Sequence, residues 1–102
     1  MSKDFELEER LWSVAKQEAA RRSFEITPSA NTFLKSLIHK GVARLISEGY
    51  ENDETRIKMA EDNLVKIIYK TSIEDRKMGI KYFRKSTFND ILGILCPIWP
   101  FC

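Results

Sequence analysis

The chain has 102 residues, of which 17 are Lys or Arg and 15 are Asp or Glu, so its net charge is only +2. Apolar side chains make up 43% of the residues, with four Gly and three Pro, which excludes collagen-like, low-complexity and wholly disordered chains. A chain of this length is expected to fold as one domain over residues 1–102 with a single modest core.

The first element expected is a helix from Asp4 to Arg22. Apolar side chains recur there at spacings of three and four from Phe5 to Ala19, which is the spacing of one helix face. Residues 23–28 then alternate apolar and polar side chains and end at a proline. Because proline disfavours helical dihedrals at the residue before it, this segment is predicted to be a connector or one short extended piece.

The clearest helical pattern lies between Pro28 and Gly49. Ser29 or Asn31 is predicted to cap its first turn, and Gly49 is predicted to follow its last turn in a left-handed conformation. The apolar stripe comprises Leu34, Leu37, Ile38, Gly41, Val42, Leu45 and Ile46.

A third helix is expected to begin at Asn52 or Asp53. Its apolar stripe runs from Ile57 to Thr71, and it is predicted to form a central antiparallel hairpin with the helix before it. The predicted core of this hairpin comprises Leu34, Leu37, Ile38, Val42, Leu45, Ile57, Leu64 and Ile68.

Two further helix starts are predicted after Thr71. Residues 72–75 resemble a capping box with Asp in place of Glu, and indicate a fourth helix that carries Ile73, Arg76, Ile80 and Phe83, either fused to the third or separated from it. Residues 86–90 give a similar start signal for a short fifth helix, which Pro97 ends. The predicted fold class is all-α: a compact bundle of four or five helices with an irregular, proline-framed apolar tail at residues 96–102.

Few residues are candidates for catalysis or metal binding. The single histidine, His39, lies on a mainly polar helix surface and is interpreted as solvated. One His and two Cys do not provide the four ligands of a structural zinc site. Adjacent acids such as Glu74 and Asp75 point about 100° apart on a helix and are interpreted as solvated faces. The sequence therefore predicts a non-enzymatic protein with no catalytic residue, cofactor or metal.

The apolar tail carries three large side chains between its prolines. If Ile98, Trp99 and Phe101 were all exposed they would form a large apolar patch, so something is expected to cover them. Either the tail closes the core, or it is a rigid peptide that anchors a protein partner. The leading functional hypothesis is a protein-interaction or regulatory module whose partner-binding residues are Ile98, Trp99, Phe101, Tyr82 and Phe83.

The cysteines and the first residues bear on the compartment. The N-terminal residues include no apolar stretch typical of a secretory signal, and the longest nearly uncharged stretch, residues 91–102, is too short to cross a bilayer. A cytoplasmic protein is therefore expected, in which Cys96 and Cys102 stay reduced. A disulfide between them remains geometrically conceivable.

Charge is distributed unevenly along the chain. Residues 48–62 hold six acids and two bases, whereas residues 66–85 hold seven bases and two acids. The alternative functional hypothesis is a nucleic-acid-binding protein that uses the basic stretch, with a solvated helix face as the simpler interpretation. The candidate phosphate contacts are Lys70, Lys77, Lys81, Arg84 and Lys85.

Two other binding modes carry less weight. A ribbon–helix–helix protein with residues 24–27 as the groove-entering strand is disfavoured because Glu25 would face the DNA. Contact of the tail and the basic stretch with a membrane surface is a weaker alternative. The sequence pattern leaves the identity of a protein partner and the oligomeric state open.

Overall fold

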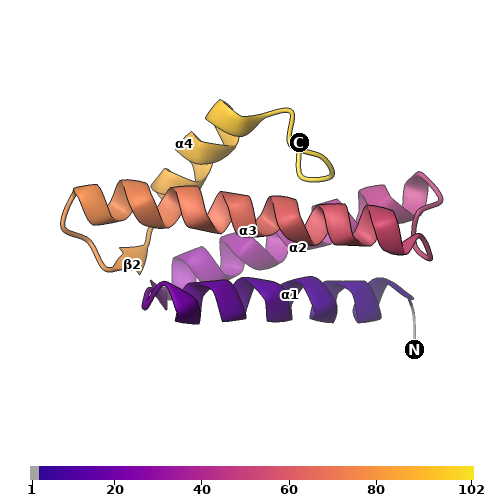
Figure 1. Cartoon of the computed structure of the whole chain (residues 1–102), viewed down its shortest axis with the longest axis horizontal. Coiled ribbons are helices and arrows are strands. Elements are labelled where there is room, and N and C mark those ends of the chain that lie inside the picture. Colours follow the sequence, from indigo (N-terminus) through magenta and orange to yellow (C-terminus); the bar gives the residue numbers. More distant parts are fainter. Residues whose placement is uncertain (1–2) are drawn as a thin grey trace.

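The computed structural model describes residues 3–102, which form four helices and one pair of two-residue strands (Figure 1). In chain order these elements are α1 (Lys3–Arg21), β1 (Glu25–Ile26), α2 (Pro28–Ser47), α3 (Glu54–Lys77), β2 (Tyr82–Phe83) and α4 (Lys85–Leu95). The prediction of an all-α bundle of four or five helices is confirmed.

The start of α2 shows how its sequence fixes its boundary. The side chain of Thr27 accepts a hydrogen bond of 3.3 Å from the backbone N–H of Ala30, and Pro28 occupies the first turn, where its missing N–H costs nothing. The predicted caps Ser29 and Asn31 are therefore wrong, since the helix begins before them. The predicted end is confirmed, because Gly49 adopts a φ of 80° just after the helix.

The third helix is continuous through the predicted restart at Ser72. Asp53 caps its start as expected, accepting from the backbone N–H of Arg56 at 3.1 Å. The hydroxyl of Ser72 donates to the carbonyl of Tyr69 at 2.7 Å within the same helix, so it does not cap a new one. The helix ends before Gly79, which has a φ of 75°, and the prediction of a separate helix through Phe83 is wrong because residues 82–83 are extended.

The helices pack differently from the predicted central hairpin. Helix α3 packs chiefly against α1 on one side and α4 on another, while α1 also packs against α2 (Figure 1). The helices α2 and α3 are joined by a tight turn but contact each other much less, so the central-hairpin prediction is wrong. The reason is the buried stripe of α1, including Leu11 and Ala15, which packs against both of them.

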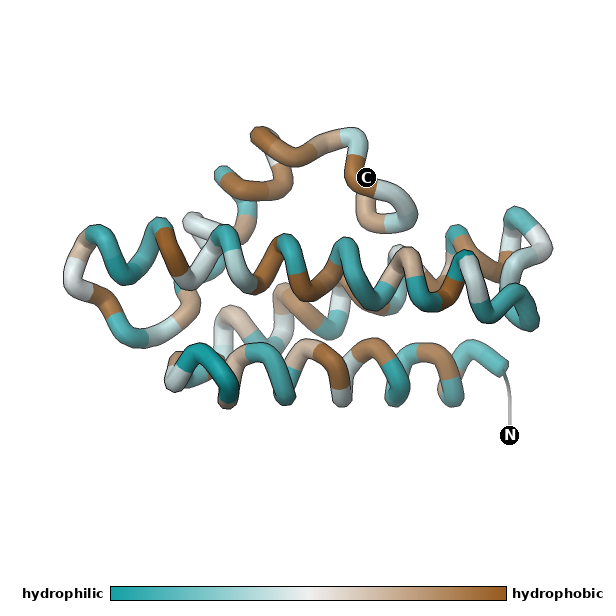
Figure 2. Tube along the Cα trace, viewed as in Figure 1, coloured by the Kyte–Doolittle hydropathy of each residue, from teal (hydrophilic) through white to brown (hydrophobic). Residues whose placement is uncertain are grey.

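The predicted core residues are all buried, so that prediction is confirmed. Three aromatic side chains extend this core: the ring of Phe83 in β2 lies 5.1 Å from that of Phe24, before β1, and 5.4 Å from that of Phe88 in α4, between centroids. Figure 2 shows the hydrophobic residues of α1 and α3 alternating with hydrophilic ones along each helix, as expected for helices with one buried face.

The order helix, turn, short strand, helix occurs twice along the chain. The helices α1 and α3 are each followed by a turn that contains a residue with positive φ, Ser23 (57°) or Gly79 (75°), and then by a short strand that leads into the next helix. The strands pair in parallel, Glu25 opposite Tyr82 and Ile26 opposite Phe83. Parallel pairing brings the last turns of α1 and α3 and the first turns of α2 and α4 to one end of the bundle.

Candidate functional site

Exposed bases gather at the end of the bundle where the strands pair. We call this set the basic end, and its members come from α1, α3, α4 and the segment before β2. The packing of α1 on α3 brings the chain segments together, and two contacts join them. The guanidinium of Arg76 donates to the backbone carbonyl of Arg22 at 2.9 Å. The guanidinium of Arg22 lies 4.2 Å from the centre of the Tyr69 ring. The basic end comprises Arg21, Arg76, Lys77, Lys81 and Lys85, all of them exposed.

A hollow of about 420 Å³ lies between the two turns of this end. Its lining includes both residues with positive φ, Ser23 and Gly79, together with Arg76 and Lys81. The guanidinium of Arg76 also lies 5.1 Å from the centre of the Phe24 ring, which holds this base in place. The hollow is therefore a concave surface flanked by two positive charges.

One arginine predicted to contact phosphate has a structural role. Arg84 Nε donates to Asp75 Oδ1 at 3.0 Å, and its backbone N–H donates to Asp75 Oδ2 at 3.3 Å. Asp75 is fully buried and also accepts from the hydroxyl of Thr87 at 2.7 Å. Because Arg84 is the N-cap of α4 and has no side-chain acceptor of its own, Asp75 of α3 holds the first turn of α4. The interpretation of Asp75 as a solvated acid is wrong.

A second buried carboxylate lies at the same end. Glu18 of α1 is 3% exposed and accepts from Arg22 Nε at 2.8 Å, while Arg21 approaches it to 3.7 Å. In both pairs the carboxylate is buried and its arginine remains partly exposed. These ion pairs therefore leave positive charge on the surface.

The remaining residues predicted to bind nucleic acid are all exposed lysines, which differ in their ion pairs and in their place along the chain. Lys81 and Lys85 are exposed and make no ion pair within the part of the chain that the structure describes. Lys77 is exposed but pairs with Glu74 at 3.2 Å, and Lys70 is exposed earlier along α3.

The two predicted aromatic residues of β2 also differ. The ring of Tyr82 is 44% exposed beside the lysines, whereas Phe83 is fully buried in the core and offers no surface to a ligand or a partner. Opposite Tyr82, on β1, lies the exposed carboxylate of Glu25. The strand pair thus presents one aromatic ring and one acid among the bases.

The sequence pattern places Arg76 in the basic stretch, residues 66–85, but gives no sign of Arg21 as a member of this cluster. The two arginines are separated by 55 positions in numbering, and only the packing of α1 on α3 brings them together. The alternation of polar and apolar side chains in residues 23–27 was the one local sign of the strand that joins the two halves.

The apolar tail packs as part of the core. Ile98 is 6% exposed and Phe101 2% exposed, while Trp99 is partly buried. The Phe101 ring fills a notch at Gly41 of α2, where an added Cβ would come within 2.5 Å of it. In this conformation Ile98 and Phe101 offer no surface to a partner, although both were candidate partner-binding residues.

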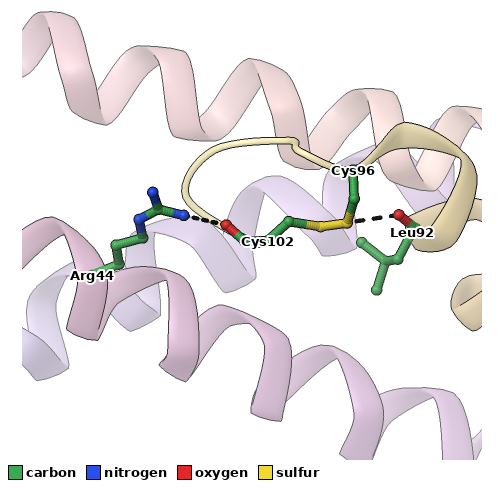
Figure 3. The surroundings of a disulfide bond; sticks show 4 residues. All are labelled: Arg44, Leu92, Cys96 and Cys102. Carbon is green, nitrogen blue, oxygen red and sulfur yellow. Dashed lines mark hydrogen bonds between the residues drawn. A yellow bond between two sulfur atoms is a disulfide. The ribbon is translucent and has the colours of Figure 1, made fainter.

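Polar contacts and a disulfide fix the tail (Figure 3). Arg44 donates to the main-chain oxygen of Cys102, and Asn63 donates to that of Trp99. The indole N–H of Trp99 donates to Glu48 at 3.0 Å. Hydrogen bonds from Arg44 and then Trp99 hold the pKa of Glu48 below its ordinary value.

The cysteines differ from the expectation of two reduced thiols. Cys96 and Cys102 are joined by a disulfide with a Cα–Cα distance of 5.7 Å, within the ordinary range for such bonds. The bond closes residues 96–102 into a ring.

The opposite end of the bundle is acidic. Arg10 of α1 donates to both carboxylate oxygens of Glu54, at 2.6 and 3.0 Å, and to Glu61 at 2.8 Å. These bonds raise the pKa of Arg10, and the bond from Arg10 lowers the pKa of Glu54. Around them lie further exposed acids, including Asp4, Glu6, Glu9, Glu48 and Asp62.

A groove along α4 is a further apolar feature of the surface. It has a volume of about 620 Å³ and is lined by residues that include Met78, Ile91 and Ile94. Ile94 is 75% exposed and Met78 63% exposed. Figure 2 shows α4 as a mainly hydrophobic helix on one side of α3.

Comparisons with known proteins found no match. No family model matches the chain, and neither does any curated protein or solved structure. Among residues 3–102, no helix is both long and apolar enough to cross a membrane. Within the same residues, no three His, Cys, Asp or Glu side chains gather to hold a metal ion.

Proposed function

We propose that the protein is a small, non-enzymatic, cytoplasmic module that binds the phosphate backbone of nucleic acids through its basic end. The observation that carries this proposal is the pairing of β1 with β2, which gathers exposed Arg and Lys side chains from four chain segments at one end of the bundle, where Arg76 and Lys81 line a hollow. Clustered cations of this kind bind phosphates through charge and counterion release.

The geometry favours contact with the backbone rather than recognition of bases. Lys81 and Lys85 flank the strand pair, and their amines bind phosphates as point charges without reading sequence. Glu25 on β1 would repel phosphates if the strands entered a groove. Tyr82 provides one partly exposed ring for stacking. The expected binding is therefore moderate, independent of sequence and strongly dependent on salt.

A titration of a fluorescent 20-nucleotide DNA, single-stranded and duplex, followed by anisotropy, tests this proposal. If about three phosphates are contacted, affinity falls about 40-fold between about 50 and 200 mM salt. The double variant Lys81→Glu/Lys85→Glu should lose at least about tenfold in affinity at the lower salt concentration, because it removes two of the contacts.

The matched control is Lys3→Glu/Lys40→Glu, which changes the net charge equally at exposed positions outside the basic end. It should lose about twofold or less, because screening limits the effect of distant charges. Arg84 is left unchanged since its loss would release α4 from Asp75. An absence of any complex at low salt, or equal losses in both double variants, would remove the proposal.

A second candidate function is recognition of a protein partner, favoured by the exposed apolar groove on α4. Ile94 and Met78 are the anchors that this candidate requires, since both are more than half exposed. Ile94→Asp should abolish binding of such a partner and leave DNA binding unchanged. The same variant therefore separates the two functions.

A further inference from the structure

We infer that the disulfide-closed tail, residues 96–102, is a redox switch. The oxidised ring keeps Ile98 and Phe101 in the core, and reduction releases the tail from its seat. We define the seat as the surface of α2 and α3 that the tail contacts at Gly41, Arg44 and Asn63. This inference rests on the cytoplasmic setting proposed above and is independent of the basic end. Its starting point is the disulfide between Cys96 and Cys102 and the buried side chains that the ring carries.

The seat of the tail is built to receive the ring. Gly41 lacks the side chain that would collide with the Phe101 ring, so the glycine forms a notch in the middle of α2. Glycine in a helix interior costs about 1 kcal/mol of helix stability relative to alanine. The packing of Phe101 is the structural feature that this glycine makes room for.

The polar contacts of the seat depend on the shape of the tail backbone. Arg44 and Asn63 bind main-chain oxygens of Cys102 and Trp99, not side chains. Trp99 lies within the ring that the disulfide closes, and the carbonyl of Cys102 is attached directly to the residue that closes it. Opening the ring lets this backbone sample other conformations, and the two contacts then lose their fixed partners.

The disulfide is accessible to a reductant. Cys96 is exposed and Cys102 partly exposed, and both line a hollow of about 410 Å³ between α2 and α4. Disulfides of cytosolic proteins are usually redox-active rather than structural, and exposed ones are the more labile. The reachable position of this bond is what a switch requires.

The chemical step is thiol–disulfide exchange with a dithiol reductant. One reductant thiolate attacks the sulfur of Cys96, the S–S bond breaks, and Cys102 leaves as a thiolate that takes up a proton. The second reductant thiol then attacks the mixed disulfide and frees Cys96 as a thiol. The reductant is oxidised to its disulfide, and two electrons and two protons have passed to the protein.

Chain entropy gives the expected size of the effect. Closing so short a loop lowers the conformational entropy of the released tail. The equilibrium constant between the packed and the released tail therefore shifts about fifty-fold toward the packed one. Reduction removes that factor. The protection of seated amides against hydrogen exchange should therefore fall by at least about tenfold.

Hydrogen exchange followed by NMR on the native protein, with and without a dithiol such as dithiothreitol, tests the inference. The reporters are the amide of Phe101, which donates to Ile98 at 2.8 Å, and the indole N–H of Trp99. Their protection should fall on reduction, while the amide of the buried Leu64 in α3 keeps its protection. The variant Cys96→Ser/Cys102→Ser should match the reduced protein and ignore the reductant.

Gly41→Ala provides a second test that does not involve sulfur. Its Cβ displaces the Phe101 ring, so the tail should be poorly protected even when the disulfide is closed. Unchanged protection of Phe101 on reduction would overturn the inference. So would loss of Leu64 protection together with that of Phe101, because the tail would then be part of one cooperative core. The DNA titration is run in both redox states, so its outcome stays separate.

Discussion

The two ends of the bundle use the same kind of ion pair and acquire opposite surface charge. At the basic end the carboxylates of Glu18 and Asp75 are buried, while Arg22 and Arg84 remain about a third exposed (34% and 32% of the side chain). At the acidic end Arg10 lies between Glu61 and Glu54, and Glu54 is 71% exposed. Arg10 (37% exposed) and Glu61 (12%) repeat the pattern of the basic end, so the difference at the acidic end is the second acid bound to Arg10, Glu54, which stays on the surface.

This comparison separates charges that hold the fold from charges available to a ligand. Arg84 and Arg22 belong to the first group because buried carboxylates hold their guanidinium groups. Lys81 and Lys85 belong to the second because no carboxylate pairs with them within residues 3–102. A count of bases along the sequence treats both groups alike.

Replacing Asp75 gives the largest effect expected. Asp75→Ala should lower the free energy of unfolding by about 3 kcal/mol, because the Arg84 guanidinium and the Thr87 hydroxyl lose a buried partner together. Urea denaturation followed by circular dichroism measures the loss. The neighbouring Glu74→Ala, at an exposed position, should change stability by less than about 0.5 kcal/mol. Equal effects of the two variants would contradict the structural role of Asp75.

Removing the arginine of the acidic end should have a smaller effect. Arg10→Met should cost about 1 kcal/mol, because its pair with Glu54 is largely solvated and the buried Glu61 keeps a second cation, Lys58, at 3.8 Å. A double-mutant cycle with Glu54→Gln isolates the exposed pair. If Arg10→Met destabilised the protein as much as Asp75→Ala, the distinction between buried and exposed pairs would fail.

The two equivalent turns offer a matched pair of substitutions. Gly79→Ala should destabilise the protein by about 1 kcal/mol, because a left-handed φ is unfavourable for a residue that has a Cβ. No steric clash adds to this, since no atom lies within 4 Å of a Cβ at this position. Ser23→Gly should stabilise by about 0.5 kcal/mol by relieving the same strain in the turn after α1. Thermal unfolding measures both, and shifts of the same sign would contradict the equivalence of the turns.

The smallest expected effect is at the acidic end, where the free energy of unfolding should depend on pH through Glu54. The pKa of Glu54 is lowered from its ordinary value of 4.5 chiefly by the hydrogen bond from Arg10. A lowered pKa in the folded state means that this stabilisation is present above about pH 4.5 and is lost as the pH falls through the folded value. Glu54→Gln should flatten the stability profile below pH 4.5, and an unchanged profile would contradict the pairing.

The sequence predicts those parts of the fold in which a periodic pattern extends over several helical turns. The stripes of α1, α2 and α3 extend over several turns, so their buried residues, such as Leu34 and Leu64, follow from spacing alone. The strand pair has two residues in each strand, too few for an alternation to be distinctive. The apparent capping box at Ser72 was misleading because its hydroxyl is satisfied inside a continuous helix.

The candidate site and the tail depended on contacts distant in the sequence. Lys81 and Lys85 follow from local charge, but Arg21 joins them only through the packing of α1 on α3. The covering of Phe101 depends on a glycine at position 41, and no local pattern connects the two. This is why the sequence left both interpretations of the tail open.

Mapping the bound surface by NMR tests the central claim most directly. In a titration of ¹⁵N-labelled protein with a short DNA duplex at low salt, the account predicts that amide shifts change at Arg21, in β1 and β2 and at Lys85, while those of the first turns of α1 and α3 stay fixed. Shift changes confined to α4 and the tail, or none at saturating DNA, would contradict it.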